Sequence, residues 1–303
     1  MKEANHVPVE LPKGDVPGDN VSVHPVQIEN AKKIFQKMKE DMPSHGKEKL
    51  VISVYGGSGS GKSGTASLLT WLFREQGIGA YLMSGDNYPL RMPKYNDAER
   101  VNIYRRSAIH GLIEAGEYTE EHFALVQKWQ QEFDDANPLH VTEHPWFAAY
   151  RNAGAKGLKG YLGTDAEQDY EEINSILEAF KNGAGAIWLK ILGREDAGLW
   201  YEKVDFSDIQ VVILEWTHGN SAYLKNVDYP IYLHSTPEET LQYRMLRNRD
   251  NHIDNPFTTM VLEIEQNLLY SQADHAKLIV TKSGEFLTVE ELQDLMKKGE
   301  ADE

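Results

Sequence analysis

The sequence predicts an α/β fold of three layers, in which a mainly parallel sheet is covered by helices on both faces. Two observations predict it. Short apolar runs rich in β-branched residues alternate along the chain with stretches of helical spacing. Each apolar run is also continuous rather than alternating, as in strands that are buried on both faces. Strands that alternate with helices pair in parallel, since each helix returns the chain to the same end of the sheet.

Each element follows from a local pattern of this kind. Strands are predicted at residues 50–55, 80–84, 210–214, 229–234 and 278–281, and a β-hairpin at residues 186–192 and 199–204. Helices are predicted at residues 27–41, 62–76, 97–115, 119–133, 168–181, 237–248, 256–270 and 289–298. Residues 137–165 contain two prolines and four glycines, and we expect them to form an irregular insertion or lid.

Composition limits the classes of function. The 303 residues carry a formal net charge of -16, which disfavours nucleic acid and anionic membrane as general partners. The absence of cysteine excludes disulfides, thiolate metal sites and a cysteine nucleophile. No apolar run is long enough to span a membrane, and the first residues lack the pattern of a signal peptide. We therefore expect a cytoplasmic protein, with a homodimer left open as its oligomeric state.

A glycine-rich loop follows the first predicted strand. Residues 56–63 read Gly-Gly-Ser-Gly-Ser-Gly-Lys-Ser and match the pattern G-x-x-x-x-G-K-[ST] in full. Glycines let successive backbone N–H groups approach a phosphate, the lysine adds a positive charge, and the serine hydroxyl can bind Mg²⁺. The pattern predicts a P-loop NTPase fold that binds ATP with Mg²⁺. The residues expected to bind the nucleotide are Gly57, Ser58, Gly59, Ser60, Gly61, Lys62, Ser63 and Gly64, and Lys62 is also expected to take part in catalysis.

Two acids lie at the carboxyl ends of predicted strands, where ligands gather in a parallel sheet. Asp86 follows the second strand, and Glu215 ends the apolar run Val-Val-Ile-Leu-Glu. Transfer of a phosphoryl group needs a carboxylate beside the acceptor hydroxyl and acidic groups near the metal. We expect Asp86 to act in catalysis, and Ser63, Asp86 and Glu215 to hold Mg²⁺.

Three arginines, Arg244, Arg247 and Arg249, lie on or just after the helix predicted at residues 237–248. Arginine binds phosphate oxygens in pairs and can stabilise charge that develops during transfer. We expect Arg244 and Arg247 to be catalytic and Arg249 to contact the nucleotide.

Together these blocks resemble the uridine kinase-like group of P-loop kinases, which includes phosphoribulokinase and pantothenate kinase. The resemblance covers about residues 50–282, and it implies that Asp86 is the general base and that the arginines belong to a lid. The residues that hold uridine in that family are missing here, so the acceptor is expected to be a different small molecule with a hydroxyl group. The division expected is an arm and helix at residues 1–49 and a P-loop kinase domain at residues 50–303, with an insertion or lid at about residues 88–165 that is expected to be largely helical.

A second, local resemblance is to adenylylsulfate kinase. Residues 84–87 and the segment Ala-Glu-Arg-Val-Asn-Ile-Tyr-Arg-Arg at 98–106 are similar to blocks of that family. It implies adenylylsulfate as an alternative acceptor, bound by Arg91, Arg100, Asn102 and Arg105. Among all candidates, the residues expected to contact the acceptor are Tyr88, Arg91, Arg100 and Arg105. A regulatory P-loop NTPase that hydrolyses ATP is a further alternative.

Overall fold

The computed structural model describes residues 11–17, 23–41, 49–193, 198–236, 239–240 and 255–302. Its internal contacts divide the chain into two compact units. Unit 1 comprises the described residues of Met1–Tyr88, Asp169–Thr236 and Leu269–Glu303, and unit 2 those of Pro89–Gln168 and Pro237–Leu268. The described part of the expected arm and the P-loop therefore lie in unit 1, whereas residues 89–168 lie in unit 2.

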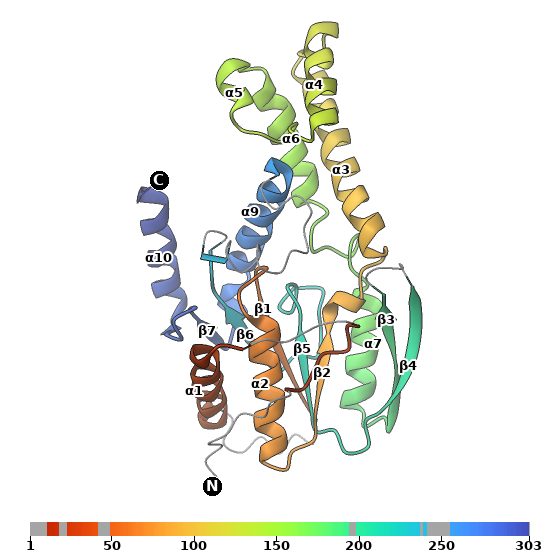
Figure 1. Cartoon of the computed structure of the whole chain (residues 1–303), viewed down its shortest axis with the longest axis vertical. Helices are drawn as coiled ribbons and strands as arrows, with labels where there is room; N and C mark the ends of the chain where they lie inside the picture. Colours follow the sequence, from red (N-terminus) through yellow and green to blue (C-terminus); the bar gives the residue numbers. More distant parts are fainter. Residues whose placement is uncertain are drawn as a thin grey trace. The chain divides into compact units, whose positions relative to one another are not determined.

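Unit 1 contains a six-stranded sheet with the order β2-β5-β1-β6-β7-β8 (Figure 1). The first five strands run parallel, and β8 pairs antiparallel with β7. The prediction of a mainly parallel sheet is confirmed, although the short strand β8 was not predicted. The strands are β1 (Leu50–Gly56), β2 (Ala80–Ser84), β5 (Val211–Glu215), β6 (Tyr229–Leu233), β7 (Leu278–Val280) and β8 (Phe286–Leu287).

Both faces of this sheet are covered, which confirms the three layers. Alternate residues of β1 point to opposite sides: Ile52 and Val54 pack with α1 and α2, whereas Val51 packs with α7 and Tyr55 with α10. The hairpin of β3 and β4 was also predicted, and β3 contributes to the core on the α7 side. The elements are α1 (Pro25–Asp41), α2 (Lys62–Glu75), α7 (Tyr170–Lys181), α10 (Val289–Asp302), β3 (Ala186–Leu192) and β4 (Leu199–Asp205).

Unit 2 is helical. Its core contains Tyr104, Trp129, Phe147 and Met260, which come from four different helices. These helices are α3 (Pro93–Glu114), α4 (Glu120–Glu132), α6 (Phe147–Lys159) and α9 (Pro256–Ser271), of which residues 256–268 belong to unit 2; the short α5 (His140–Glu143) precedes α6. Of the helix predicted at 237–248, only Glu239 and Thr240 are described, and both are helical. No helix in the described ranges has the length and apolar character needed to cross a membrane.

The prediction that residues 137–165 are irregular is wrong, because α6 occupies the middle of this segment. Its glycines serve close helix packing rather than turns. A Cβ added to Gly154 would lie 2.5 Å from the ring of Tyr104, and one added to Gly157 would lie 2.0 Å from the Oγ atom of Ser107. Since both neighbours belong to α3, the two helices approach more closely than larger residues would permit.

We predict that Gly157→Ala lowers the free energy of unfolding by about 1–3 kcal/mol, the usual cost of overpacking. Alanine in a helix is otherwise favoured over glycine by about 1 kcal/mol, so propensity alone predicts the opposite sign. Gly160→Ala is the matched control, because a Cβ there would have its nearest neighbour at 3.4 Å. Urea unfolding of both variants measures the effect, and a Gly157→Ala protein as stable as the control would contradict the packing argument.

Candidate nucleotide and phosphoryl-transfer site

The P-loop connects the end of β1 to the start of α2, as the sequence predicts. Gly56 has φ 155° and Gly61 has φ 94°, values that side chains disfavour. A Cβ on Gly56 would also lie 2.4 Å from the carbonyl oxygen of Leu233 in the neighbouring strand. The loop can therefore turn tightly only with glycine at these positions, and α2 begins directly after it at Lys62. A phosphate placed in the loop would face the N-terminus of this helix.

The lysine and the serine of the loop both have partners in unit 1. The Nζ atom of Lys62 donates a hydrogen bond to the carbonyl oxygen of Gly57 at 2.9 Å, so the ammonium group faces the loop. The Oγ atom of Ser63 donates to the Oε1 atom of Glu215 at 3.2 Å. Two of the three residues expected to hold Mg²⁺ are thus in direct contact, although they are far apart in the sequence. A hydroxyl and a carboxylate are oxygen donors of the kind that Mg²⁺ prefers.

Asp86 lies in a short 3-10 turn that follows β2, next to the strand that ends in Glu215. The neighbours Ser84, Gly85, Asn87 and Tyr88 are buried, whereas Asp86 itself is exposed. Gly85 packs against the indole of Trp216, and a Cβ there would lie 2.0 Å from its Cγ atom. The turn therefore presents one acid to solvent from an otherwise buried segment.

A polar cluster that the sequence did not reveal lies next to Tyr88, the residue that follows this turn. Lys190, in β3, is 5% exposed, and its Nζ atom is 3.0 Å from a carboxylate oxygen of Glu172 and 3.6 Å from one of Asp169. The same ammonium group lies 5.2 Å from the centre of the Tyr88 ring. The strand pattern around Lys190 could not predict these ion pairs, because both acids come from a distant segment, the start of α7.

A second acid that sequence reasoning missed is Asp15, in the segment before α1. Its Oδ1 atom accepts hydrogen bonds from the backbone N of Ser84 at 2.7 Å and from the Nδ2 atom of Asn87 at 3.1 Å. Burial raises the pKa of Asp15 to about 7, against the opposing effect of the bond from Ser84. An aspartate between glycine, valine and proline is typical of a turn, so the sequence did not indicate this contact.

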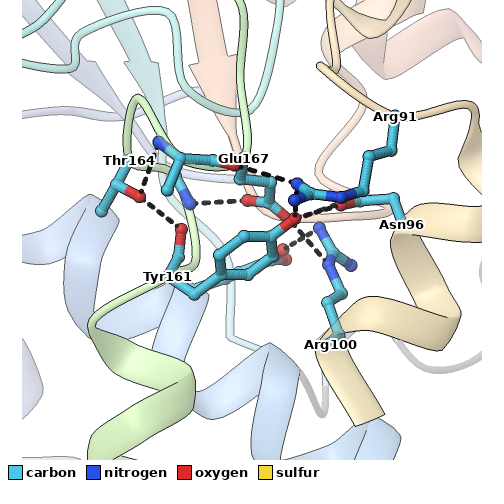
Figure 2. A network of polar contacts seen from close by, with 9 residues as sticks. Arg91, Asn96, Arg100, Tyr161, Thr164 and Glu167 are labelled. Carbon is cyan, nitrogen blue, oxygen red and sulfur yellow. Dashed lines mark hydrogen bonds and ion pairs between the residues drawn. The ribbon is translucent and has the colours of Figure 1, made fainter. Parts of the chain in front are cut away.

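The arginines expected at the acceptor lie in unit 2, where each has partners. Arg100 donates from Nε to Glu167 at 2.7 Å and lies 3.6 Å from Glu265. Arg91 donates to the hydroxyl of Tyr161 at 3.0 Å, and that hydroxyl donates to Asn96 (Figure 2).

Glu167 is the centre of this network, and its side chain is fully buried. Its carboxylate accepts from Arg100, from the Nδ2 atom of Asn96 and from the backbone N of Gly163. A buried carboxylate needs such donors, since an unpaired charge in a low-dielectric core is costly. Arg105 is likewise bonded to both carboxylate oxygens of Asp135. Arg100 and Arg105 therefore hold unit 2 together in this structure, and their contact with an acceptor stays a prediction.

Arg244, Arg247 and Arg249 lie outside the described residues, so their predicted roles are neither supported nor contradicted here.

Comparison with known proteins shows what this chain resembles. No protein-family model matches the chain. It is 38% identical over 258 residues to the bifunctional alpha-galactosidase/sucrose kinase AgaSK of Mediterraneibacter gnavus. This chain is similar to a kinase. The alignment covers 85% of this chain and 23% of the relative, so the chain spans about a quarter of that protein's length. The resemblance to a kinase drawn from the sequence motifs is confirmed.

Solved structures show a partial likeness to this chain at low sequence identity. A candidate fructose transport system kinase from Silicibacter sp. TM1040 has a TM-score of 0.47 and 14% identity, over 80% of this chain and 94% of that one. The phosphoribulokinase of Rhodobacter spheroides has a TM-score of 0.45 and 14% identity, over 78% and 70% of the two chains. At these scores the likenesses carry no argument.

The raised pKa of Asp15 predicts a pH-dependent stability. Between about pH 4 and pH 7 the folded state keeps a proton that the unfolded chain has released, so raising the pH over this window destabilises the fold. Asp15→Asn cannot titrate. Its free energy of unfolding relative to wild type should therefore rise by about 3 kcal/mol from pH 5 to pH 8, because wild type loses about 1.4 kcal/mol for each of the roughly two pH units between pH 5 and the pKa of Asp15.

Denaturant unfolding at pH 5 and pH 8 measures this difference. Asp205→Asn is the control, because a hydrogen bond from the backbone N of Ser207 lowers the pKa of that exposed acid. Asp205 is therefore ionised throughout the window and its variant should show no such change. If wild type and Asp15→Asn kept a constant difference in stability, Asp15 would not titrate as described.

Proposed function

We propose that this chain is an ATP-dependent kinase that transfers the γ-phosphate to a hydroxyl group of a sugar. The observation that carries the proposal is the contact between Ser63 of the P-loop and Glu215, on the same edge of the sheet as the exposed Asp86. This edge combines a phosphate loop, oxygen donors for Mg²⁺ and an acid on the adjacent strand, which are the groups that phosphoryl transfer requires.

Each residue has a role in this proposal. The backbone of residues 57–61 binds the phosphates, and Lys62 neutralises charge on the β- and γ-phosphate oxygens. Ser63 and Glu215 hold Mg²⁺, with Asp86 contributing through water, because Mg²⁺ keeps several of its water ligands. When bound, the metal spreads the negative charge of the phosphates. Arg244, Arg247 and Arg249 are proposed to contact ATP from the lid.

Asp86 is proposed as the general base. Phosphoryl transfer passes through a loose transition state, so the acid mainly orients the acceptor hydroxyl and takes its proton late. Its exposed side chain, on a turn whose other residues are buried, suits this task because the backbone that carries it is held firmly.

A sugar is the acceptor that the relative supports. Its name joins an α-galactosidase to a sucrose kinase, and a P-loop serves phosphoryl transfer rather than glycoside hydrolysis, which uses a pair of carboxylic acids. Adenylylsulfate is not supported, since Arg100 and Arg105 are already bonded to Glu167 and Asp135.

An acceptor screen tests this function. ADP release with Mg²⁺ and ATP should depend on the acceptor and should be strongest with a sugar such as sucrose or fructose, and weak with uridine or adenylylsulfate. Phosphorylation of uridine at the rate of the best sugar would contradict the proposal. ADP release that is independent of every acceptor would instead indicate the NTPase alternative.

We predict that Lys62→Ala lowers kcat/KM for ATP by at least about 10²-fold, because the charge on the transferred phosphate is left unbalanced. Lys128→Ala, a change of an exposed lysine in α4, is the control and should leave kcat/KM unchanged. Calorimetry with ATP and Mg²⁺ should show weaker binding only for Lys62→Ala. Unchanged affinity together with intact turnover would place the nucleotide elsewhere.

We predict that Asp86→Asn lowers kcat by about 10²–10⁴-fold, the usual scale for loss of a general base. The amide keeps the shape of the side chain, so KM for ATP should change little. Asp208→Asn, an exposed acid before β5, provides the control. The role of Asp86 would be rejected by a variant whose kcat with the best sugar equals that of wild type.

A further inference from the structure

Residues 11–17, here called the strap, run against the sheet and α2 within unit 1. Leu11 packs against the core on the α1 and α2 side, and Val16 is buried. Between them the carbonyl oxygen of Pro12 accepts a hydrogen bond from the Oγ atom of Ser67 in α2. The strap is therefore anchored on both sides of Asp15, which fixes where that carboxylate lies.

Asp15 bonds the turn that carries Asp86 at two points. Its Oδ1 atom accepts from the backbone N of Ser84 at 2.7 Å and from the Nδ2 atom of Asn87 at 3.1 Å. The carbonyl oxygen of Asp15 accepts from the same Nδ2 atom at 3.3 Å. β2 is an edge strand, so the N–H of Ser84 finds its acceptor in a side chain instead of a neighbouring strand.

The remaining contacts of Asn87 connect the strap to the hairpin. Its Oδ1 atom accepts from the backbone N of Leu192 at 3.1 Å, while its amide nitrogen donates to Asp15. Ser84 also caps the turn, because its Oγ atom accepts from the backbone N of Asp86. Every residue that flanks Asp86 is thus fixed by a side-chain bond or by packing, and two of these bonds end on the carboxylate of Asp15.

We infer that Asp15 is a positioning residue for phosphoryl transfer: its carboxylate orders the turn at residues 84–87 and thereby sets the direction of Asp86. This inference rests on the proposed function of Asp86. Misplacing a reacting group by about 1 Å can cost about 10²-fold in rate. A reaction that depends on Asp86 is therefore faster when Asp15, in the strap, holds the backbone of residues 84–87 in place.

The contrasting explanation is that Asp15 only anchors the strap. The two roles differ in what they do to a protein that already lacks the base. If Asp15 acts through Asp86, its loss has no further effect once Asp86 is asparagine, since residues that act as a unit are not additive. If it is only an anchor, its loss lowers activity by the same factor in both backgrounds.

The experiment measures kcat and both KM values for four proteins: wild type, Asp15→Ala, Asp86→Asn and the double variant. We expect Asp15→Ala to lower kcat by about 10–100-fold in the wild-type background and by less than about threefold in the Asp86→Asn background. KM for ATP should change little, because the P-loop is untouched. Equal losses in the two backgrounds would overturn the inference.

Three further variants separate positioning from folding. Asp15→Asn keeps an oxygen that can accept from Ser84 and should recover most of kcat at pH 7. The side chain of Asp15→Ser is too short to reach both donors, so this variant should lose as much kcat as Asp15→Ala. It replaces Asp15→Ala in the experiment if the alanine variant is too unstable to purify. Lys13→Ala, an exposed residue of the strap, should match wild type. An Asp15→Asn protein as slow as Asp15→Ala would contradict the role assigned to the carboxylate oxygen.

A crystal structure of Asp15→Ala provides a readout that needs no acceptor. We expect the backbone of residues 84–87 to shift by more than about 0.5 Å, the tolerance of a catalytic geometry. An unmoved turn would overturn the inference whatever the reaction. Two other outcomes would count against the proposed function instead: wild-type protein that phosphorylates no sugar, or an Asp86→Asn variant with full kcat. The crystal structure of Asp15→Ala would then still decide whether Asp15 positions the turn.

Discussion

The site depends on the parallel pairing of β5 with β1 on one side and β2 on the other. In this register Glu215 lies opposite Val54 in β1 and opposite Ser84 in β2. Parallel strands end at the same edge, so the P-loop that follows β1, the acid that ends β5 and the turn that follows β2 all meet there. The hydrogen bond from Ser63 to Glu215 is the direct sign of this convergence.

The fold could be predicted from the sequence where local pattern and tertiary role agree. Continuous apolar runs marked the strands, and the P-loop marked the first strand–helix junction. The prediction fails at α6, because glycine and proline in a local pattern indicate turns, whereas here the glycines lie inside a helix. Gly154 and Gly157 are there because α3 passes so close that a Cβ would clash with Tyr104 and Ser107. No property of α6 alone encodes the approach of another helix, so a local pattern could not show it.

The site, like the fold, could be predicted from the sequence only in part. Lys62, Ser63 and Glu215 belong to motifs whose chemistry depends on residues next to one another. Asp15 and Lys190 do not, since their partners come from β2, the turn after it and the start of α7. For two arginines, by contrast, the sequence pattern predicts a role in the site that the structure does not show. Arg100 and Arg105 lie in a segment that resembles the acceptor-binding helix of adenylylsulfate kinase, yet in this structure each is bonded to a buried acid of unit 2.

The strand order also bears on how the chain reaches this structure during synthesis. β1 and β2 are made early, but the strand that lies between them, β5, begins only at Val211. Until then neither has a partner from this sheet, so their apolar edges are open to unwanted association with other chains. Contacts this distant in sequence slow folding. Residues 89–168, by contrast, can pack α3 against α6 as soon as both have left the ribosome. The α3–α6 part of unit 2 is thus able to form before β5 completes the nucleotide site, although α9, which also contributes to the core of unit 2, is made later.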